Sequence, residues 1–256
     1  MSSLLTKSKT NLKKIIFNLR WSTGVPIFVY QMGKVASSSI YRSLFEQYLR
    51  GNVIHGQHFR PQHYYWQVEK LYKYYDDNKP IKIISPIREP IGRNVSAFFH
   101  NSFHNPEKKK VAFNLNDTPL GELKNIFLEY YDHEWPLNWF DNNIKKHFHI
   151  DVYEYKFPQS GYLELKKKNT ELLLLKHDLK NETKEEIIKE FTGLNSFHLK
   201  SLNKGSGKKY ADKYVQFKKQ VRLPDWYLDK MVKSKYFQHF YTQEEINAVI
   251  AKWKCT

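Results

Sequence analysis

The hydrophobic residues of this chain fall into short runs that alternate with longer segments of helical spacing. Ile27–Tyr30 and residues 81–85 are apolar, β-rich runs of the kind that form buried strands. Leu172–Leu175 is the most apolar run, and we expect it to be a central strand. Shorter strands are expected at residues 52–55 and 150–155.

The segments between these runs carry apolar residues at helical spacing. In the first of them, Ile40, Leu44 and Leu49 form an apolar stripe, and Ser37–Ser39 supply candidate N-caps. Pro90 is expected to open a helix, since proline is tolerated at that position. The predicted helices span residues 37–49, 64–75, 90–99, 120–146 and 184–191, with further helices beyond residue 209.

This alternation predicts the fold class. Strands that alternate with helices favour an α/β architecture, in which helices flank both faces of a mainly parallel central sheet. Polar loops are expected at residues 104–120 and 203–209, but no segment has the composition of a domain linker. We therefore expect one domain over residues 1–256, of which residues 1–24 form a basic N-terminal segment.

The chain is strongly basic, with 42 Lys and Arg against 26 Asp and Glu, a formal net charge of +16. Such an excess favours anionic partners such as nucleotides, nucleic acid, acidic polysaccharide or a membrane surface. Cys255 is the one cysteine, so no internal disulfide can form and a cytoplasmic setting is expected. Residues 1–20 lack the features of a signal peptide. They can form a helix packed on the domain or an amphipathic helix that lies on the membrane surface.

The loop after the first strand carries groups that bind anions. Gly33 and Lys34 precede the three hydroxyls of Ser37–Ser39, at the start of a predicted helix. Ligands bind beyond the carboxyl ends of parallel strands, and a helix start offers unpaired N–H groups to a phosphate. An ATPase P-loop would need a glycine five residues before Gly33, where Phe28 stands. A helix start with a solvated lysine is the alternative interpretation.

A second group of such residues follows the third strand, which Pro86 is expected to end. Arg88 comes directly afterwards, where its guanidinium can fork onto a phosphate. Ser96, on the helix that Pro90 opens, can reach the same phosphate with its hydroxyl. Arg93 lies between them, and we expect it to brace the loop through acidic residues.

Residues 88–98, REPIGRNVSAF, resemble the 3′-phosphate-binding segment R-[DE]-P-x-x-R-x-x-S-x-[FY] of sulfotransferases that use 3′-phosphoadenosine 5′-phosphosulfate (PAPS). The segment Lys34–Ser39 resembles the 5′-phosphosulfate loop of this superfamily, in the K-x-A-S-T-S form of polysaccharide 2-O-sulfotransferases. The resemblance implies a P-loop-like sulfotransferase fold in which Arg88 and Ser96 hold the 3′-phosphate. It assigns the 5′-phosphosulfate to Gly33, Lys34, Ala36, Ser37, Ser38 and Ser39.

Later segments resemble the same superfamily. Residues 172–193 resemble its strand-plus-helix segment, but Lys176 and His177 stand where the family has a Tyr-Glu pair, so the role of that acid is not carried over. Residues 203–210 resemble the basic loop that closes over the nucleotide, which assigns Lys204, Gly205 and Lys208 to nucleotide binding.

Most of the chain also resembles bacterial capsular polysaccharide synthesis proteins. The PAPS motifs themselves cover only about residues 27–45 and 81–99. Together the two resemblances imply an enzyme that transfers a sulfuryl group from PAPS to a hydroxyl of a polysaccharide or other glycan.

The acceptor hydroxyl must lose its proton to a base as it attacks sulfur. His55 and His58 follow the second predicted strand and resemble the His-Gly-x-His segment of 2-O-sulfotransferases. One would act as the base and the other would position the acceptor, and the sequence leaves open which does which. Further candidates are His100, His104 and Glu69. Without a third ligand at useful spacing, a metal site is the weaker interpretation.

The mechanism implied by the resemblance places Lys34 beside the bridging oxygen, where charge develops as the S–O bond breaks. No metal is expected, and the basic surface favours an anionic glycan as acceptor. A nucleic-acid-binding protein is the main alternative, but the chain carries no such motif, so nucleic acid is not an expected partner. A nucleotide kinase is a further alternative, although the third strand lacks the acidic residue of a metal-binding NTPase strand.

Overall fold

The computed structural model describes residues 15, 17–21, 23–57, 66–104, 113–200 and 210–254, with side chains for all of these except residues 101–104. The described chain forms two compact units. The first, called the sheet unit, draws on Met1–Gln31, Ala36–Pro86 and Tyr162–Lys200. The second, called the helical unit, draws on Met32–Val35, Ile87–Gly161 and Ser201–Thr256.

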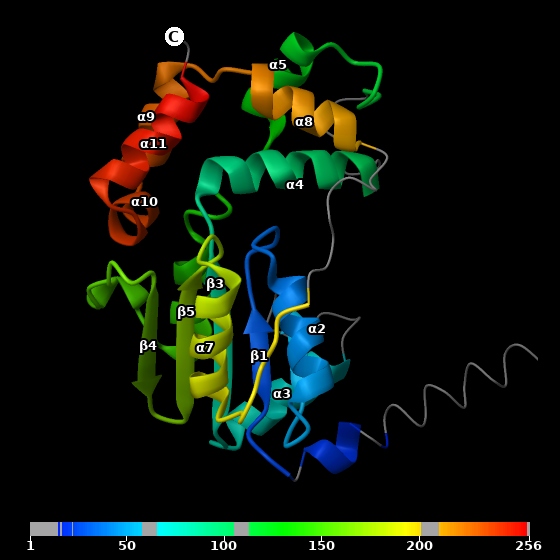
Figure 1. Cartoon of the computed structure of the whole chain (residues 1–256), viewed down its shortest axis with the longest axis vertical. Coiled ribbons are helices and arrows are strands. Elements are labelled where there is room, and N and C mark those ends of the chain that lie inside the picture. The colour runs from blue at the N-terminus through cyan, green and yellow to red at the C-terminus, as the bar shows by residue number, and fades with distance from the viewer. Residues whose placement is uncertain are drawn as a thin grey trace, which may run out of the picture. The chain divides into compact units, whose positions relative to one another are not determined.

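The sheet unit contains a five-stranded sheet in the order β2-β1-β3-β5-β4 (Figure 1). Strand β1 pairs in parallel with both β2 and β3, whereas β4 and β5 form an antiparallel pair. The fold is therefore α/β with a mostly parallel sheet, as the alternating pattern predicts. The strands are β1 (Ile27–Tyr30), β2 (Val53–Gly56), β3 (Ile81–Ile87), β4 (Tyr162–Lys167) and β5 (Thr170–Lys176).

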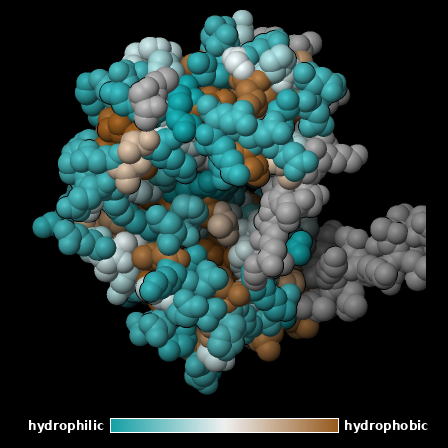
Figure 2. All heavy atoms as spheres, turned by 45° about the horizontal axis from the view of Figure 1, so that its top comes forward, coloured by the Kyte–Doolittle hydropathy of each residue, from teal (hydrophilic) through white to brown (hydrophobic). Residues whose placement is uncertain are grey.

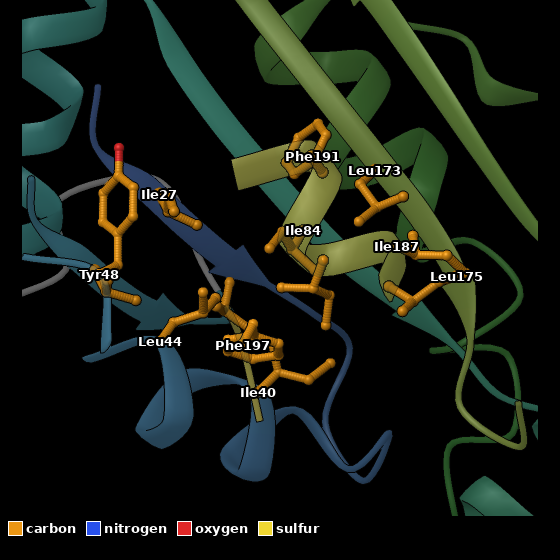
Figure 3. Close-up of a cluster of buried hydrophobic side chains, with 13 residues drawn as sticks. Ile27, Ile40, Leu44, Tyr48, Ile84, Leu173, Leu175, Ile187, Phe191 and Phe197 are labelled. Atoms are coloured by element: carbon orange, nitrogen blue, oxygen red, sulfur yellow. The ribbon is translucent and has the colours of Figure 1, made fainter. Parts of the chain in front are cut away.

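Helices α2 (Ser37–Gln47), α3 (Trp66–Asp76) and α7 (Asn181–Thr192) accompany this sheet. Helices α2 and α7 cover one face through a cluster of aliphatic and aromatic side chains (Figure 3). Ile40 and Leu44 come from α2, Ile187 from α7, and Ile84 and Leu173 from the strands. Burial of these side chains supplies the main stabilisation of the unit, about 1.5–3 kcal/mol for each large one.

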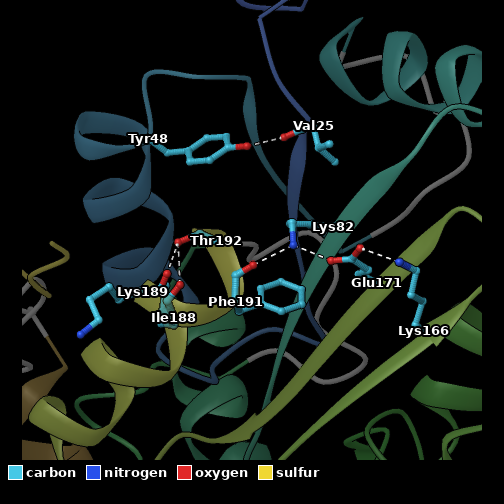
Figure 4. A network of polar contacts seen from close by, with 9 residues as sticks. All are labelled: Val25, Tyr48, Lys82, Lys166, Glu171, Ile188, Lys189, Phe191 and Thr192. Carbon is cyan, nitrogen blue, oxygen red and sulfur yellow. Dashed lines mark hydrogen bonds and ion pairs between the residues drawn. The ribbon is translucent and has the colours of Figure 1, made fainter. Parts of the chain in front are cut away.

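Polar contacts fix the ends of this layer (Figure 4). The Lys82 ammonium on β3 donates to the Phe191 carbonyl of α7 at 2.7 Å and pairs with the Glu171 carboxylate of β5. The Tyr48 hydroxyl, just after α2, donates to the Val25 carbonyl at 2.7 Å. These bonds tie the helices to the strands that they cover.

The helical unit has an aromatic core. Phe217 meets Phe99 and Phe127 edge to face, with ring centroids 5.3 and 6.0 Å apart, and the three rings come from three helices. A second group of rings is built around the wholly buried Trp139 and Tyr236. The elements are α4 (Pro90–His104), α5 (Leu120–Tyr130), η2 (Asp141–Lys145), α6 (Lys146–Phe148), η3 (Val152–Glu154), α8 (Ala211–Gln220), α9 (Asp225–Val232), α10 (Lys235–Phe240) and α11 (Gln243–Trp253).

Two expectations in the middle of the chain are wrong, and one strand there was not predicted. The helix predicted for residues 120–146 ends at Tyr130, because Asp132 accepts the N–H groups of Glu134 and Trp135 in a turn and Pro136 follows. The strand predicted at residues 150–155 is a 3-10 turn in which Asp151 accepts the Tyr153 N–H. An antiparallel strand, β4, occupies residues 162–167, where no strand is predicted.

The expected boundaries elsewhere differ in smaller ways. Strand β3 continues through Pro86 to Ile87, because β1 pairs with β3 only as far as Ile84 and no ladder bond with β1 needs a donor at Pro86. The strand Leu172–Leu175 is an interior strand with all four leucines buried, but β3 occupies the middle of the sheet. Helix α7 ends at Thr192, one residue beyond the predicted end, and Gly193 follows in the left-handed conformation.

The face of the molecule drawn in Figure 2 is mostly hydrophilic. In Figure 2, hydrophobic residues form separate patches among hydrophilic ones. Near the N-terminus, Phe17 and Trp21 pack edge-on against Trp66 and Tyr74 of α3. Within the described ranges, no helix combines the length and the apolar character needed to cross a bilayer.

Candidate active site

The loop between β1 and α2 has an unusual backbone. Gly33, Lys34 and Ala36 all adopt positive φ angles, of 83°, 63° and 60°. A left-handed conformation costs a residue with a Cβ about 1–2 kcal/mol, and such strain gathers at functional sites. Ala36 is the N-cap of α2 and no side chain caps that helix, so the expectation that Ser37–Ser39 supply the cap is wrong.

In the sheet unit, the start of α2 meets the end of β2. The Ser37 hydroxyl lies 2.9 Å from His55 Nε2, and the Gln31 amide nitrogen lies 3.4 Å from the same atom. The Tyr41 ring stacks on the imidazole, with centroids 5.1 Å apart. These contacts bring together two residues predicted separately from sequence, Ser37 and His55.

The contacts of His55 define its chemical state. The Gln31 amide nitrogen can only donate, so Nε2 is the acceptor and a neutral ring carries its proton on Nδ1. Burial lowers the pKa of His55 from 6.5 to about 4. At neutral pH the ring is therefore an uncharged imidazole whose Nε2 lone pair faces a hydroxyl, the arrangement required of a base.

In the helical unit, Arg93 is buried and its guanidinium binds the main chain of the loop. Its Nε donates to the Gly33 carbonyl at 3.1 Å, and a terminal nitrogen donates to the Met32 carbonyl at 2.6 Å. The other terminal nitrogen donates to the Tyr131 hydroxyl at 3.1 Å. Arg93 thus braces the loop, as expected, but through carbonyl and hydroxyl oxygens in place of the expected acidic residues.

Arg88 makes the second connection between the two motifs. Its guanidinium donates to the Lys34 carbonyl at 2.7 Å, and its own carbonyl accepts the Tyr236 hydroxyl at 3.1 Å. The Lys34 main chain and the Arg88 side chain therefore meet within one unit. Arg88 is only half-buried, so part of its side chain is reachable by a ligand.

The Glu-Pro pair after Arg88 has a structural role. Glu89 directly precedes α4, and its carboxylate accepts the Gly92 N–H at 2.7 Å, a bond typical of an N-cap side chain and the third helical residue. Pro90 occupies the first helical position, where no N–H is needed. Burial raises the pKa of Glu89. The segment thereby fixes where α4 begins, just beyond Arg88.

The remaining predicted residues fall into three groups. Ser38, Ser39 and Ser96 are half-buried, the first two in the first turn of α2 and the last on α4. Of the alternative bases, Glu69 forms an ion pair with Lys73 on α3 and His100 is half-buried on α4. His58, Lys204, Gly205, Lys208 and the side chain of His104 lie outside the described residues.

Four residues of the site were missed from the sequence. Gln31 and Tyr41 contact His55, while Trp135 and Tyr236 bind main-chain oxygens of Met32 and Arg88. Gln31 directly follows β1, so its position at the ligand edge was available as a signal. The Trp135 and Tyr236 contacts join residues more than 100 positions apart, which no local pattern reveals.

The family of the chain follows from a comparison with family models. The model of the family NKWYS, described as "Putative capsular polysaccharide synthesis protein", matches residues 110–242, just over half of the chain. The chain belongs to this family. The match covers most of the helical unit, including Trp135 and Tyr236, and ends before α11. No curated protein and no solved structure matches the chain.

Proposed function

We propose that this protein is a PAPS-dependent sulfotransferase with a P-loop-like fold that places a sulfuryl group on a hydroxyl of a polysaccharide. The observation that carries the proposal is the junction of the two motifs in the helical unit. Arg93 and Arg88 bind three successive carbonyls of the loop, those of Met32, Gly33 and Lys34. A nucleotide with phosphates at both ends requires two such anion-binding segments that are held in a fixed position relative to each other.

The sheet topology supports the same ligand position. Strands β1 and β3 are parallel neighbours, and the two motifs leave their carboxyl ends. The strand that follows β1 in the chain, β2, lies on one side of β1, and β3 lies on its other side. Open α/β sheets bind ligands at such a switch point. Membership of a capsular polysaccharide synthesis family supports a glycan as the acceptor.

Each residue has a role in this proposal. Arg88 and Ser96 hold the 3′-phosphate, and the amides and hydroxyls at the start of α2 hold the 5′-phosphate. The Lys34 ammonium stabilises the bridging oxygen as the S–O bond breaks. His55 accepts the proton of the attacking hydroxyl, with His58 as the second candidate for that role.

The test is calorimetric titration with the desulfated nucleotide, 3′-phosphoadenosine 5′-phosphate, beside ATP and random DNA. A charge-assisted hydrogen bond contributes about 1.5–3 kcal/mol, so Arg88→Ala should weaken binding of this nucleotide roughly 10- to 150-fold. Arg222→Ala is the matched control, because Arg222 is also half-buried in the helical unit and also donates to main-chain carbonyls.

The proposal fails if the wild-type protein does not bind the desulfated nucleotide, or if Arg88→Ala binds it with unchanged affinity. Tighter, magnesium-dependent binding of ATP would identify a kinase instead. Arg93→Met is expected to behave differently from Arg88→Ala. It takes a donor away from buried oxygens of the loop, so it should lower the free energy of unfolding by about 1–3 kcal/mol.

A further inference from the structure

The helical unit contains a pocket that neither nucleotide motif uses. Its cavity volume is about 240 Å³, below the roughly 300–1,000 Å³ typical of sites for drug-sized ligands. A pocket of this size suits a single ring. Its polar lining consists of Asp132, Glu134, Asn138, Asn142 and Asn143, joined by the indoles of Trp135 and Trp139.

The local fold explains why these side chains converge. The Asp132 carboxylate holds the turn that carries Trp135, and hydrogen bonds from Asn138 N to Glu134 O and from Asn142 N to Asn138 O continue the chain helically. Residues four apart then lie on one face. The wholly buried Trp139 anchors this face, and its carbonyl accepts the Asn143 amide at 2.9 Å. Asn138 and Asn142 therefore present exposed amides side by side.

The chemistry of the lining selects a class of ligand. Each amide both donates and accepts hydrogen bonds, which matches a sugar hydroxyl that does the same. The half-buried Trp135 indole offers a flat apolar surface for the C–H face of a sugar ring. Among the described residues that line the pocket, the charged ones are Asp132 and Glu134, and none is basic. Glu134 is paired with the Lys230 ammonium at 2.8 Å, so it is mainly the Asp132 carboxylate that can accept from a hydroxyl and repel an acidic sugar.

The pocket is also connected to the loop of the proposed active site. The Trp135 indole N–H donates to the Met32 carbonyl at 3.1 Å, the same oxygen that accepts from Arg93. Met32 directly precedes Gly33 and Lys34. A ligand that contacts Trp135 thus contacts a side chain bonded to the proposed phosphosulfate loop.

We propose that this pocket binds a neutral sugar residue of the acceptor polysaccharide. Its role as an acceptor subsite rests on the proposed sulfotransferase function, but its binding chemistry does not. The net charge of the whole chain favours an anionic glycan, whereas the lining of this pocket favours uncharged hydroxyls. The sugar held here is therefore a neutral residue, whatever charge the rest of the polymer carries.

The experiment is a titration of the full chain with glucose, galactose and N-acetylglucosamine, and with glucuronic acid as the charged counterpart. Ligand-observed NMR detects binding, and protein-observed titration gives the affinity. At least one neutral sugar should bind in the millimolar range. Asn138→Ala with Asn142→Ala should weaken it by about 5- to 150-fold, the effect of losing two hydrogen bonds. Asn247→Ala, at an exposed amide of α11 in the same unit, is the matched control and should leave binding unchanged.

Three outcomes overturn the proposal: no neutral sugar binds, the double variant binds the sugar like wild type, or glucuronic acid binds more tightly than its neutral counterpart. A titration of the same variant with 3′-phosphoadenosine 5′-phosphate separates the two proposals. We expect nucleotide binding to be unchanged in the double variant. If the protein binds the sugar but not the nucleotide, the proposed sugar pocket is supported and the proposed sulfotransferase function is contradicted.

Discussion

Two half-buried histidines, His55 in the sheet unit and His133 in the helical unit, differ in what surrounds them. Burial lowers the pKa of His55 in the sheet unit and of His133 in the helical unit, each to about 4. His133 uses both ring nitrogens within the fold: Nε2 donates to the Phe127 carbonyl at 2.8 Å, and Nδ1 accepts the Tyr227 hydroxyl at 2.9 Å. His55 instead directs Nε2 toward Ser37 and Gln31, at the start of a helix.

A shifted pKa does not by itself identify a histidine as a base. A strongly perturbed group in a cleft is a candidate for function, but a structural network perturbs pKa values too. Both histidines have the same direction and cause of shift, so the partners decide. We interpret His133 as part of the packing of the helical unit and His55 as the residue available for proton transfer.

Substitution of each histidine by alanine should separate these two roles, and His55→Ala should have the larger effect on turnover. Loss of a general base lowers turnover by about 10²- to 10⁴-fold, so His55→Ala should lose most sulfuryl transfer from PAPS to a panel of glycans. Its affinity for the desulfated nucleotide should stay close to that of wild type. His133→Ala should retain turnover per folded molecule but lose about 2–4 kcal/mol of stability in urea unfolding, because it leaves two buried partners unpaired.

Assays of His58→Ala complete this test, since His58 is the other candidate. If His55→Ala keeps near-normal turnover while His58→Ala loses it, the base is His58, and the contacts of His55 are structural like those of His133. If both keep near-normal turnover, the base lies elsewhere in the chain.

The next prediction concerns how the free energy of unfolding depends on pH. Both histidines have folded pKa values of about 4, below the ordinary 6.5, so the unfolded chain takes up these protons at a higher pH than the folded chain. Stability contributed by the neutral rings is fully present above pH 6.5 and is lost as pH falls toward 4. At about 1.4 kcal/mol per unit, each ring contributes up to about 3 kcal/mol.

Urea unfolding at pH 4.5–7.5 measures this slope, and the difference between wild type and each alanine variant isolates one ring from the acidic side chains. A bound anion raises the pKa of a neighbouring histidine. Saturating desulfated nucleotide should therefore reduce the slope contributed by His55 and leave that of His133 unchanged. An equal change at both rings would contradict their different roles.

The two units also differ in how far their structure could be predicted from sequence. In the sheet unit, short apolar runs and strand–helix alternation predicted β1, β2, β3, β5 and the helices between them. The failures lie mostly in the helical unit, where Asp132 and Asp151 hold turns through their own side chains. Such local bonds compete with regular structure and leave the hydrophobic pattern unchanged. The polar edge strand β4 was missed because only Leu165 of its residues is buried.

The candidate site shows the same division. The residues proposed to bind the nucleotide were selected because they follow strand ends at short spacing, and their role stays a prediction. The partners that hold them, Trp135 for the loop and Tyr236 for Arg88, come from distant segments brought in by tertiary packing. The low pKa of His55 could not be predicted either, because burial depends on the whole fold.

The smallest effects come from two glycines, one in each unit, that need to be glycine for different reasons. A Cβ on Gly92 would lie 2.2 Å from Glu89 Oε1 and displace the carboxylate from its bond with the Gly92 N–H, so Gly92→Ala should cost about 1–2 kcal/mol despite the better helix propensity of alanine. A Cβ on Gly193 meets no atom within 4 Å, but the φ of +70° disfavours a side chain, so Gly193→Ala should cost about 1 kcal/mol. Asparagine tolerates the left-handed conformation, so Gly193→Asn should recover part of that loss in urea unfolding, whereas Gly92→Asn should recover none. If Gly92→Asn recovers stability, the contact with Glu89 is not what constrains position 92. If Gly193→Asn recovers none, the positive φ is not what constrains position 193.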